Sequence, residues 1–193
     1  MKYFFFDTET TGKILDYKDK NIANHANFPR IVQIAYIVTD NIGTELVKQE
    51  HIIKLNGFII PEDVIKIHGI SNEIANLQGI DLSIVLNELL LYINPCDTIV
   101  CHNVNFDLFV LAAEFSRMGI TQPNRKLKIC TMETTKEFVG LENSYGYKFP
   151  KLQELYKKLF GSEFDKAHNA LADIQATKKC FFELKQKHNF YNE

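Results

Sequence analysis

Runs of apolar residues separated by polar segments dominate the first part of the chain. The segments 2–8 (KYFFFDT) and 31–39 (IVQIAYIVT) are apolar runs of strand length, and the polar segment 12–28 between them is predicted as a surface loop. A turn at 41–43 leads from the second run to a third, at 44–54. Because connections this short join antiparallel strands, the pattern predicts an antiparallel meander.

Helical periodicity replaces this pattern after about residue 60. The segment 82–93 (LSIVLNELLLYI) is clearly amphipathic, and Asn94-Pro95 ends it. Strands and helices then alternate to the end of the chain. The later strands are predicted at 98–102 and 127–130, and the helices at 61–67, 71–77, 82–93, 105–118, 131–139, 151–160 and 169–187. A meander followed by this alternation predicts an α/β fold in one domain, residues 1–193, whose mixed five-stranded sheet is covered by helices.

The composition suits a globular protein, because 46% of the 193 residues are hydrophobic and supply a sizeable core. A net charge of -2 argues against a protein that coats nucleic acid through a broad basic surface, but leaves open an enzyme that grips a short strand. The four cysteines lack C-x-x-C spacing and lie in apolar runs, so we expect reduced core cysteines. The apolar start is too short for a signal peptide or membrane span, which predicts a cytoplasmic protein without membrane association.

Acidic residues stand where the pattern predicts burial. Asp7 and Glu9 come at the end of the first strand as an i, i+2 pair, which places both side chains on one face of a sheet. A polar turn from Asp7 to Gly12, with side chains satisfying local backbone groups, accounts for them equally well. Asp107 follows the strand at 98–102 and borders an apolar helical stripe, although a first-turn acid also complements the helix dipole.

Asp173 lies inside the predicted apolar face of the last helix. The residues that share this face are Ile174, Thr177, Cys180, Phe181 and Leu184. A carboxylate that faces a core needs a hydrogen-bond partner or a cation, so a structural Asp and a metal ligand both fit. If the four acids Asp7, Glu9, Asp107 and Asp173 met within about 5 Å, their six pairwise repulsions would total roughly 20 kcal/mol at an effective dielectric constant of about 20. Convergence would therefore require protonation or bound divalent cations.

Three segments resemble the exonuclease motifs of the DEDDh (DnaQ-like) 3′→5′ exonucleases: 7–12 (DTETTG), 102–107 (HNVNFD) and 168–173 (HNALAD). Their order and spacing agree with the family, and the resemblance extends over nearly the whole chain. Supporting segments are 29–34 (PRIVQI), 67–70 (IHGI) and 151–155 (KLQEL). The family includes the proofreading epsilon subunit of bacterial DNA polymerase III, ribonuclease T and oligoribonuclease. It implies an RNase H-like fold, whose mixed sheet agrees with the pattern described above.

The resemblance also implies a catalytic centre with two divalent ions, Mg²⁺ or Mn²⁺, for which carboxylate oxygens are suitable ligands. It implies that Asp7, Glu9 and Asp173 hold the first ion directly. Asp7 would bridge to the second ion, on which Asp107 would act directly or through water. His168 is similar to the family's general base, which takes a proton from the attacking water.

The resemblance further implies where the substrate lies. The 3′-terminal nucleotide is expected along the end of the first motif and beside a later histidine, at Thr8, Thr10, Thr11, Gly12 and His68. A histidine that merely ends a helix accounts for His68 as well. Of the other residues in the second motif, His102 is expected to support the fold, Phe106 to lie in the core, and Asn103 to hydrogen-bond the start of the helix.

The function expected from these residues is a metal-dependent 3′→5′ exonuclease that releases nucleoside 5′-monophosphates from a single-stranded or frayed end. We expect DNA as the substrate, in proofreading or end trimming; an exoribonuclease or oligoribonuclease is the alternative. The segment 188–193 after the last helix is short, unlike the long polymerase-binding tail of some epsilon subunits. This favours a free-standing enzyme, and it leaves a non-covalent polymerase partner and the oligomeric state open.

Two other classes of protein compete with this expectation. A phosphatase of the haloacid-dehalogenase type also has an acidic strand end, but it requires D-x-D where this chain has Glu9, and it leaves the segment 168–173 unexplained. A non-catalytic strand-binding or polymerase-accessory module would share the fold. All five expected catalytic residues are present, which argues against a silent module.

Overall fold

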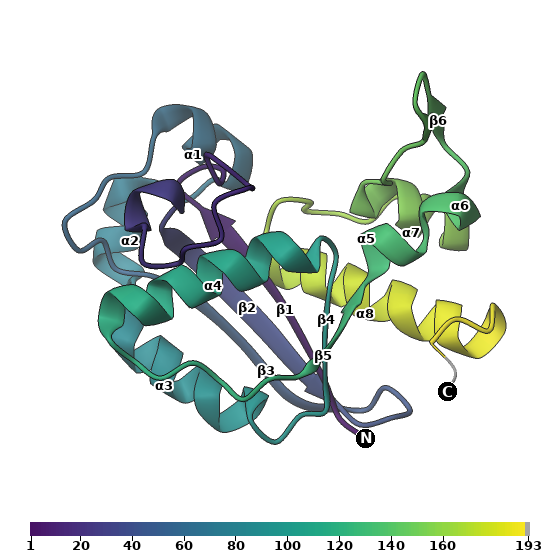
Figure 1. The fold of residues 1–193 in the computed structure, drawn as a ribbon, viewed down its shortest axis with the longest axis horizontal. Coiled ribbons are helices and arrows are strands. Elements are labelled where there is room, and N and C mark those ends of the chain that lie inside the picture. Colours follow the sequence, from purple (N-terminus) through teal and green to yellow (C-terminus); the bar gives the residue numbers. More distant parts are fainter. Residues whose placement is uncertain (192–193) are drawn as a thin grey trace.

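A five-stranded mixed sheet forms the centre of the computed structural model, which describes residues 1–191 (Figure 1). The strand order is β3-β2-β1-β4-β5. The strands are β1 (Tyr3–Thr10), β2 (Ile31–Thr39), β3 (Glu45–Ile52), β4 (Thr98–Cys101) and β5 (Leu127–Cys130). The first three pair antiparallel, whereas β4 and β5 run parallel to β1. The predicted fold class is therefore confirmed, while the last two residues of the predicted C-terminal tail lie outside the described part.

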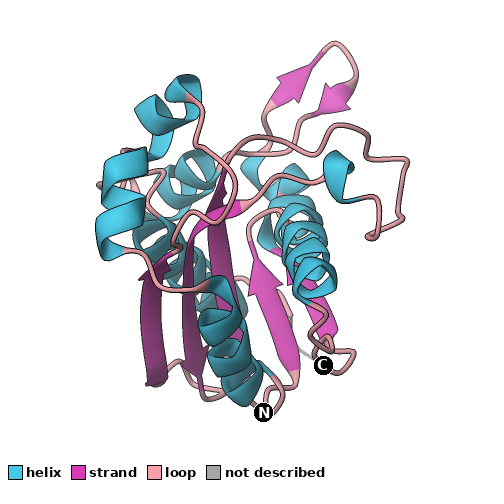
Figure 2. Cartoon of the chain, turned by 90° about the vertical axis from the view of Figure 1, so that its left-hand side faces the viewer, coloured by secondary structure: helices cyan, strands magenta, loops and turns pink. Residues whose placement is uncertain are grey.

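Helices cover both faces of this sheet (Figures 1 and 2). The α-helices of the described chain are α1 (Glu62–His68), α2 (Asn72–Gln78), α3 (Leu82–Ile93), α4 (Val104–Met118), α5 (Thr131–Thr134), α6 (Lys136–Val139), α7 (Leu152–Phe160) and α8 (Ala170–Lys187). Helices α3 and α4 pack on one face and α8 packs on the other. Within residues 1–191, no helix combines the length and apolar character that crossing a membrane requires.

Strand β1 is apolar on both sides because a helical layer covers each of them. Phe4 and Phe6 belong to the cluster that includes α3 and α4, whereas Tyr3 and Phe5 pack with α8. This alternation has a consequence for the acidic end of the strand: odd-numbered residues face α8 and even-numbered residues face α4. All four cysteines are buried and free, as the sequence predicts.

Three elements differ from the sequence prediction. Strand β1 continues to Thr10, so Glu9 is paired in the sheet, and a register shift follows between Glu9 and Thr10. The helix predicted at 131–139 is interrupted at Thr135, which separates α5 from α6. A hairpin of β6 (Glu142–Asn143) and β7 (Gly146–Tyr147), which projects from the body in Figure 1, is not predicted. Its two-residue strands are too short to show any periodicity.

Candidate active site

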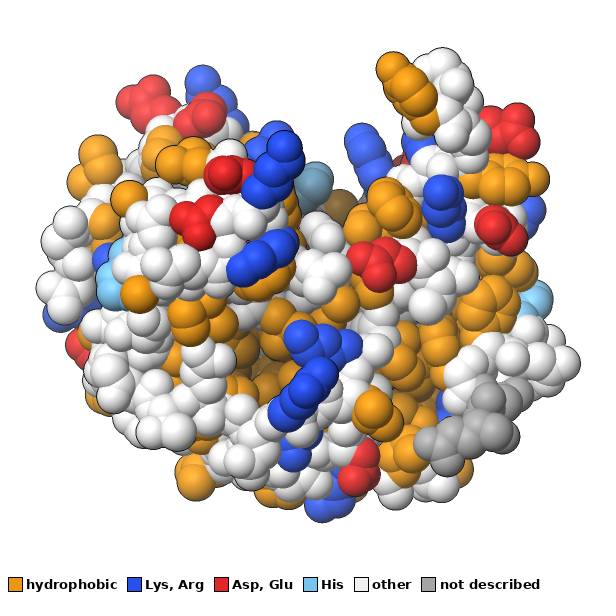
Figure 3. Space-filling view, viewed as in Figure 1, with side chains coloured by type: hydrophobic (Ala, Val, Ile, Leu, Met, Phe, Trp, Pro, Cys, Tyr) orange, Lys and Arg blue, Asp and Glu red, His pale blue; other side chains and the backbone are white. Residues whose placement is uncertain are grey.

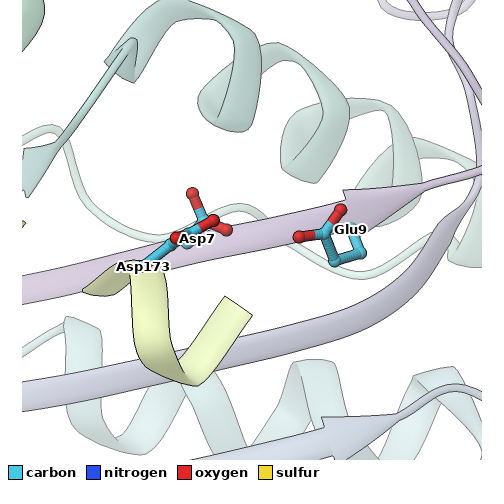
Figure 4. A group of neighbouring side chains, drawn as sticks. All are labelled: Asp7, Glu9 and Asp173. Carbon is cyan, nitrogen blue, oxygen red and sulfur yellow. The ribbon is translucent and has the colours of Figure 1, made fainter. Parts of the chain in front are cut away.

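Three carboxylates meet beside the end of β1 (Figure 4). Oxygen atoms of Asp7, Glu9 and Asp173 all lie within 4.8 Å of one another. Asp7 and Glu9 are odd-numbered residues of β1 and therefore project towards α8, whose first turn carries Asp173. Helix α8 packs along β1 and β2, and this packing brings the two distant segments together.

Asp107 approaches the same stretch of β1 from the α4 side of the sheet. It is only 3% exposed, in the first turn of α4. The backbone N–H and the hydroxyl of Thr8 both donate to Asp107 Oδ1, over 3.1 and 2.8 Å. The side chain of Thr8 can reach Asp107 because even-numbered residues of β1 face α4. Asp107 is thus separate from the group of three, but its charge is the strongest neighbouring influence on the pKa of Asp7.

Burial raises the pKa of all four carboxyl groups, and repulsion from acidic neighbours adds to the shift at Asp7, Glu9 and Asp107. The pKa of Asp7 lies well above its ordinary value, through burial and then through its three acidic neighbours. Burial, Asp173 and Asp107 raise the pKa of Glu9 to about 8. Burial raises the pKa of Asp107 to about 7, against the opposing hydrogen bonds from Thr8. Burial raises the pKa of Asp173 to about 6, although the backbone N–H of His168 opposes the shift.

The donor set suits hard divalent cations. All the donors are carboxylate oxygens, which Mg²⁺ and Mn²⁺ prefer over the sulfur and nitrogen donors typical of structural zinc sites. Within the described residues, none of the four carboxylates forms an ion pair with a Lys or Arg side chain. The charge of the group therefore calls for protons or metal ions, and the residues fit a metal site.

Comparison with known proteins shows the family to which the chain belongs. The family model described as Exonuclease matches residues 4–181. The chain belongs to the DnaQ-like exonuclease family. A DNA polymerase III of PolC type from Mycoplasma genitalium is 26% identical over 187 residues, which make up 96% of this chain and 11% of that protein. This chain thus spans about a tenth of the length of that relative.

Solved structures with the same fold include E. coli exonuclease I. Its complex with a dA16 oligonucleotide has a TM-score of 0.77 and 21% identity, over 97% of this chain and 41% of that chain. The zinc-bound form of its complex with single-stranded DNA has a TM-score of 0.77 and 20% identity, over 98% of this chain and 41% of that chain. The RNase H-like fold expected from the sequence is thereby confirmed.

The raised pKa values make the stability of the metal-free protein depend on pH. A carboxyl whose pKa is higher in the folded than in the unfolded state stabilises the fold at low pH, and loses this contribution as pH rises through the folded value. With values of about 6 to 8 at Asp173, Asp107 and Glu9, we expect Tm to fall by at least about 5 °C between about pH 5 and pH 8. Calorimetry in the presence of a chelator measures this fall.

Two further samples show whether the carboxylates cause the change. Saturating Mn²⁺ should reverse the fall, because an ion that binds only the folded state stabilises it. Glu9→Gln should flatten the curve, because it removes the group whose pKa is raised to about 8. A chelated wild-type protein with a constant Tm across this range would contradict the assignment.

His168 lies on the loop between α7 and α8, where its side chain is exposed. Its backbone has a left-handed conformation, with φ of 67°, and its N–H donates to Asp173 Oδ2 over 3.1 Å. The backbone of His168 is thus held against a carboxylate of the site while the imidazole extends into solvent. This position agrees with the predicted placement just before the last helix.

The N-terminus of α8 is held in place by a polar network that sequence reasoning missed. Gln33 Oε1 accepts the N–H of Ala170 over 3.1 Å, and Gln33 Nε2 donates to Glu50 Oε1 over 2.9 Å. The side chain of Asn169 donates to the same Glu50 oxygen over 3.2 Å. The network therefore fixes the helix end between His168 and Asp173. One signal was present in the sequence, because Gln33 is a buried polar residue within an otherwise apolar strand.

The second motif mainly supports the fold around β4. His102 bridges the hydroxyl of Thr131 and the carbonyl of Pro150, each over 3.0 Å, and burial lowers its pKa to about 4. Phe106 packs against the main core, as expected. The expectation for Asn103 was wrong, because its side chain makes no hydrogen bond with the helix start. Instead it takes a left-handed conformation, with φ of 82°, which Asn tolerates better than most residues where the chain leaves the strand.

The residues expected to contact substrate already have partners within the protein. The hydroxyls of Thr10 and Thr11 bond the carbonyl of Gly12 (2.7 Å) and the N–H of Arg30 (3.0 Å). With the Thr8 hydroxyl on Asp107, all three threonines hold the segment in shape. His68 Nδ1 accepts the N–H of Ile70 over 3.1 Å, which leaves Nε2 buried without a partner among the described residues.

Proposed function

We propose that residues 1–193 form one exonuclease domain that removes nucleotides from the 3′ end of a strand and releases nucleoside 5′-monophosphates. The proposal depends above all on one observation: three carboxylates with oxygens within 4.8 Å of one another and without a basic partner in the described chain. Asp7, Glu9 and Asp173 would hold one Mg²⁺ or Mn²⁺ ion. Asp7 and Asp107 would hold a second ion, Asp107 directly or through water.

When bound, two divalent ions supply a nucleophile near neutral pH and stabilise charge on the attacking and leaving oxygens. The protein contributes position and proton transfer. Asp107 reaches the site with one oxygen fixed by Thr8, which leaves its other oxygen available. His168 accepts the proton of the attacking water as the general base. Its backbone bond to Asp173 keeps the imidazole within a short loop movement of the carboxylates.

We infer that the terminal nucleotide lies along Thr8–Gly12, contacting mainly backbone groups because the threonine hydroxyls are already bonded. His68 would lie near the terminal base, where its unpartnered Nε2 offers a hydrogen-bond donor. Single-stranded or frayed DNA is the proposed substrate. Similarity to an exonuclease I solved with dA16 and dT13, and to a DNA polymerase III of PolC type, supports DNA and a role beside a polymerase.

The decisive experiment uses single-stranded and duplex DNA and RNA, each labelled at the 5′ end, with Mg²⁺ or Mn²⁺. Removal from the 3′ end should shorten the labelled strand one nucleotide at a time, and single-stranded DNA should react fastest. Chelation should lower the rate at least about 100-fold, because the ions stabilise charge in the transition state. Chromatography should identify nucleoside 5′-monophosphates as products.

The same assay separates the competing classes. Immediate release of a labelled mononucleotide from the 5′ end would overturn the proposed polarity, and faster shortening of RNA would overturn the proposed polymer. Hydrolysis of a small phosphomonoester without strand shortening would indicate a phosphatase. Strand binding without metal-dependent products would indicate a non-catalytic module.

A further inference from the structure

A pocket with an apolar floor and a basic rim lies between α4 and β5. We call it the α4–β5 pocket; Leu108, Phe109 and Ala112 of α4 form part of its floor, and Arg125, Lys126 and Lys128 stand at its rim. Its volume is about 360 Å³, within the usual range of small-ligand pockets. Figure 3 shows Lys and Arg side chains gathered in the middle of this face, beside an apolar hollow.

The pocket is separate from the carboxylate site. At about 100° per residue, Phe109 and Ala112 lie about 160° and 140° around α4 from Asp107, and Leu108 lies about 100° from it. Asp107 faces β1 through Thr8. A nucleotide held at the carboxylates would therefore have helix α4 between itself and the pocket floor.

Basic residues are concentrated at the rim, with Asp97 beside Arg125 and Lys126 in an adjoining hollow. The segment 115–132 contains four basic residues and no acidic one, although acidic residues outnumber basic ones in the whole chain. Arg117 pairs with the buried Glu114, which also pairs with Arg30, but Arg125 and Lys128 form no ion pair within the described chain. No Asp or Glu contributes to the described lining of the pocket. The pocket is therefore complementary to a ligand with both negative charge and apolar groups.

An open strand edge borders the pocket. Strand β5 is the last strand of the sheet, and no segment within residues 1–191 pairs with its outer side. Because the N–H of Leu127 bonds inward to the carbonyl of Asp97, strand alternation turns the N–H and C=O of Lys128 outward. An outward row of this kind can accept an additional strand, and a lysine on it favours an acidic strand over a basic one.

We propose that the α4–β5 pocket binds an extended acidic segment of a partner protein. The segment adds to the edge of β5, places an apolar side chain over Leu108 and Phe109, and places acidic side chains beside Arg125 and Lys128. A polypeptide fits better than a nucleic-acid strand for two reasons. Only a peptide backbone matches the outward N–H and C=O of β5, and the floor is mainly apolar, without aromatic faces on both sides of a base.

Fluorescence anisotropy with a short labelled peptide, in which Asp alternates with Leu or Phe, tests the proposal. The wild-type protein should bind this probe, and added salt should weaken the binding. The double variant Arg125→Glu, Lys128→Glu should raise Kd at least about tenfold, because both charge contacts become repulsive. The matched variant Lys157→Glu, Lys158→Glu on the exposed side of α7 makes the same change in net charge and should leave Kd unaltered.

A second pair of variants tests strand addition. Lys128→Ala keeps the outward N–H, whereas Lys128→Pro removes it, so the proline variant should bind the peptide more weakly than the alanine variant. Hydrolysis of a short oligonucleotide should stay at the wild-type rate in the double glutamate variant. The proposal is overturned if the peptide fails to bind, or binds the double variant normally. It is also overturned if that variant instead loses affinity for a single strand with a blocked 3′ end.

Discussion

Replacing Asp7 with Asn is expected to lower the rate of strand hydrolysis by about 10⁴-fold or more, which corresponds to about 5.5 kcal/mol of activation free energy. Asp7 is the carboxylate proposed to contact both ions, and Asn brings no negative charge. The same substitution should raise the Tm of the chelated protein near pH 8. It removes one member of a buried acidic group in which three neighbours raise the pKa of Asp7.

Opposite changes in activity and stability distinguish this result from simple unfolding. Steady-state hydrolysis of a labelled strand and calorimetry under chelation measure the two quantities on the same sample. Asp63→Asn, on the exposed first turn of α1, is the matched control and should change neither. A variant at Asp7 that kept its rate within about tenfold would remove this residue from the catalytic centre.

The second large effect is expected at His168. His168→Ala should lower kcat by about 10² to 10⁴-fold, the usual contribution of a general base. Metal binding should persist, because the contact of this residue with the site is the backbone bond to Asp173, which alanine retains. Titration calorimetry with Mn²⁺ and single-turnover hydrolysis at matched metal concentration measure the two properties separately.

His188→Ala provides a control on the same helix, because His188 follows the opposite end of α8 and packs against Phe138. Its hydrolysis rate should equal that of the wild type. Near-wild-type turnover by His168→Ala would exclude this histidine from the mechanism. Loss of Mn²⁺ affinity in that variant would instead indicate that the imidazole helps to hold the metal.

The raised pKa values indicate that the four acids destabilise the fold while they are both deprotonated and without metal ions. Four acids from β1, α4 and α8 lie around one stretch of β1, and each has a raised pKa. Elsewhere in the molecule a buried acid has basic partners: Glu114 pairs with both Arg30 and Arg117. The contrast supports a function for the unpaired group, because a fold that needed only stability would gain from neutralising it.

Much of the secondary structure could be predicted from the sequence because it depends on local periodicity. The predicted boundaries of β2 and α3 agree with the structure, and the residues predicted on the inner face of α8 are buried. Elements without a periodic pattern were missed, namely the short β6–β7 hairpin and the break at Thr135. The extension of β1 beyond residue 8 to Thr10 was missed as well, because the apolar run ends before the strand does.

The sequence by itself determined the sheet type, the order of the motifs and the acidic residues that were candidates for a metal site. Only the tertiary structure decided that Asp7, Glu9 and Asp173 share the α8 side of β1. It also decided that Asp107 lies on the α4 side, where it accepts a hydrogen bond from Thr8 of the same strand, and that Gln33 holds the start of α8. The physical reason is separation along the chain: Thr8 and Asp107 are 99 positions apart, and Gln33 and Ala170 are 137 apart. Periodicity reports which face of an element is buried, whereas such contacts depend on how whole layers pack against one another.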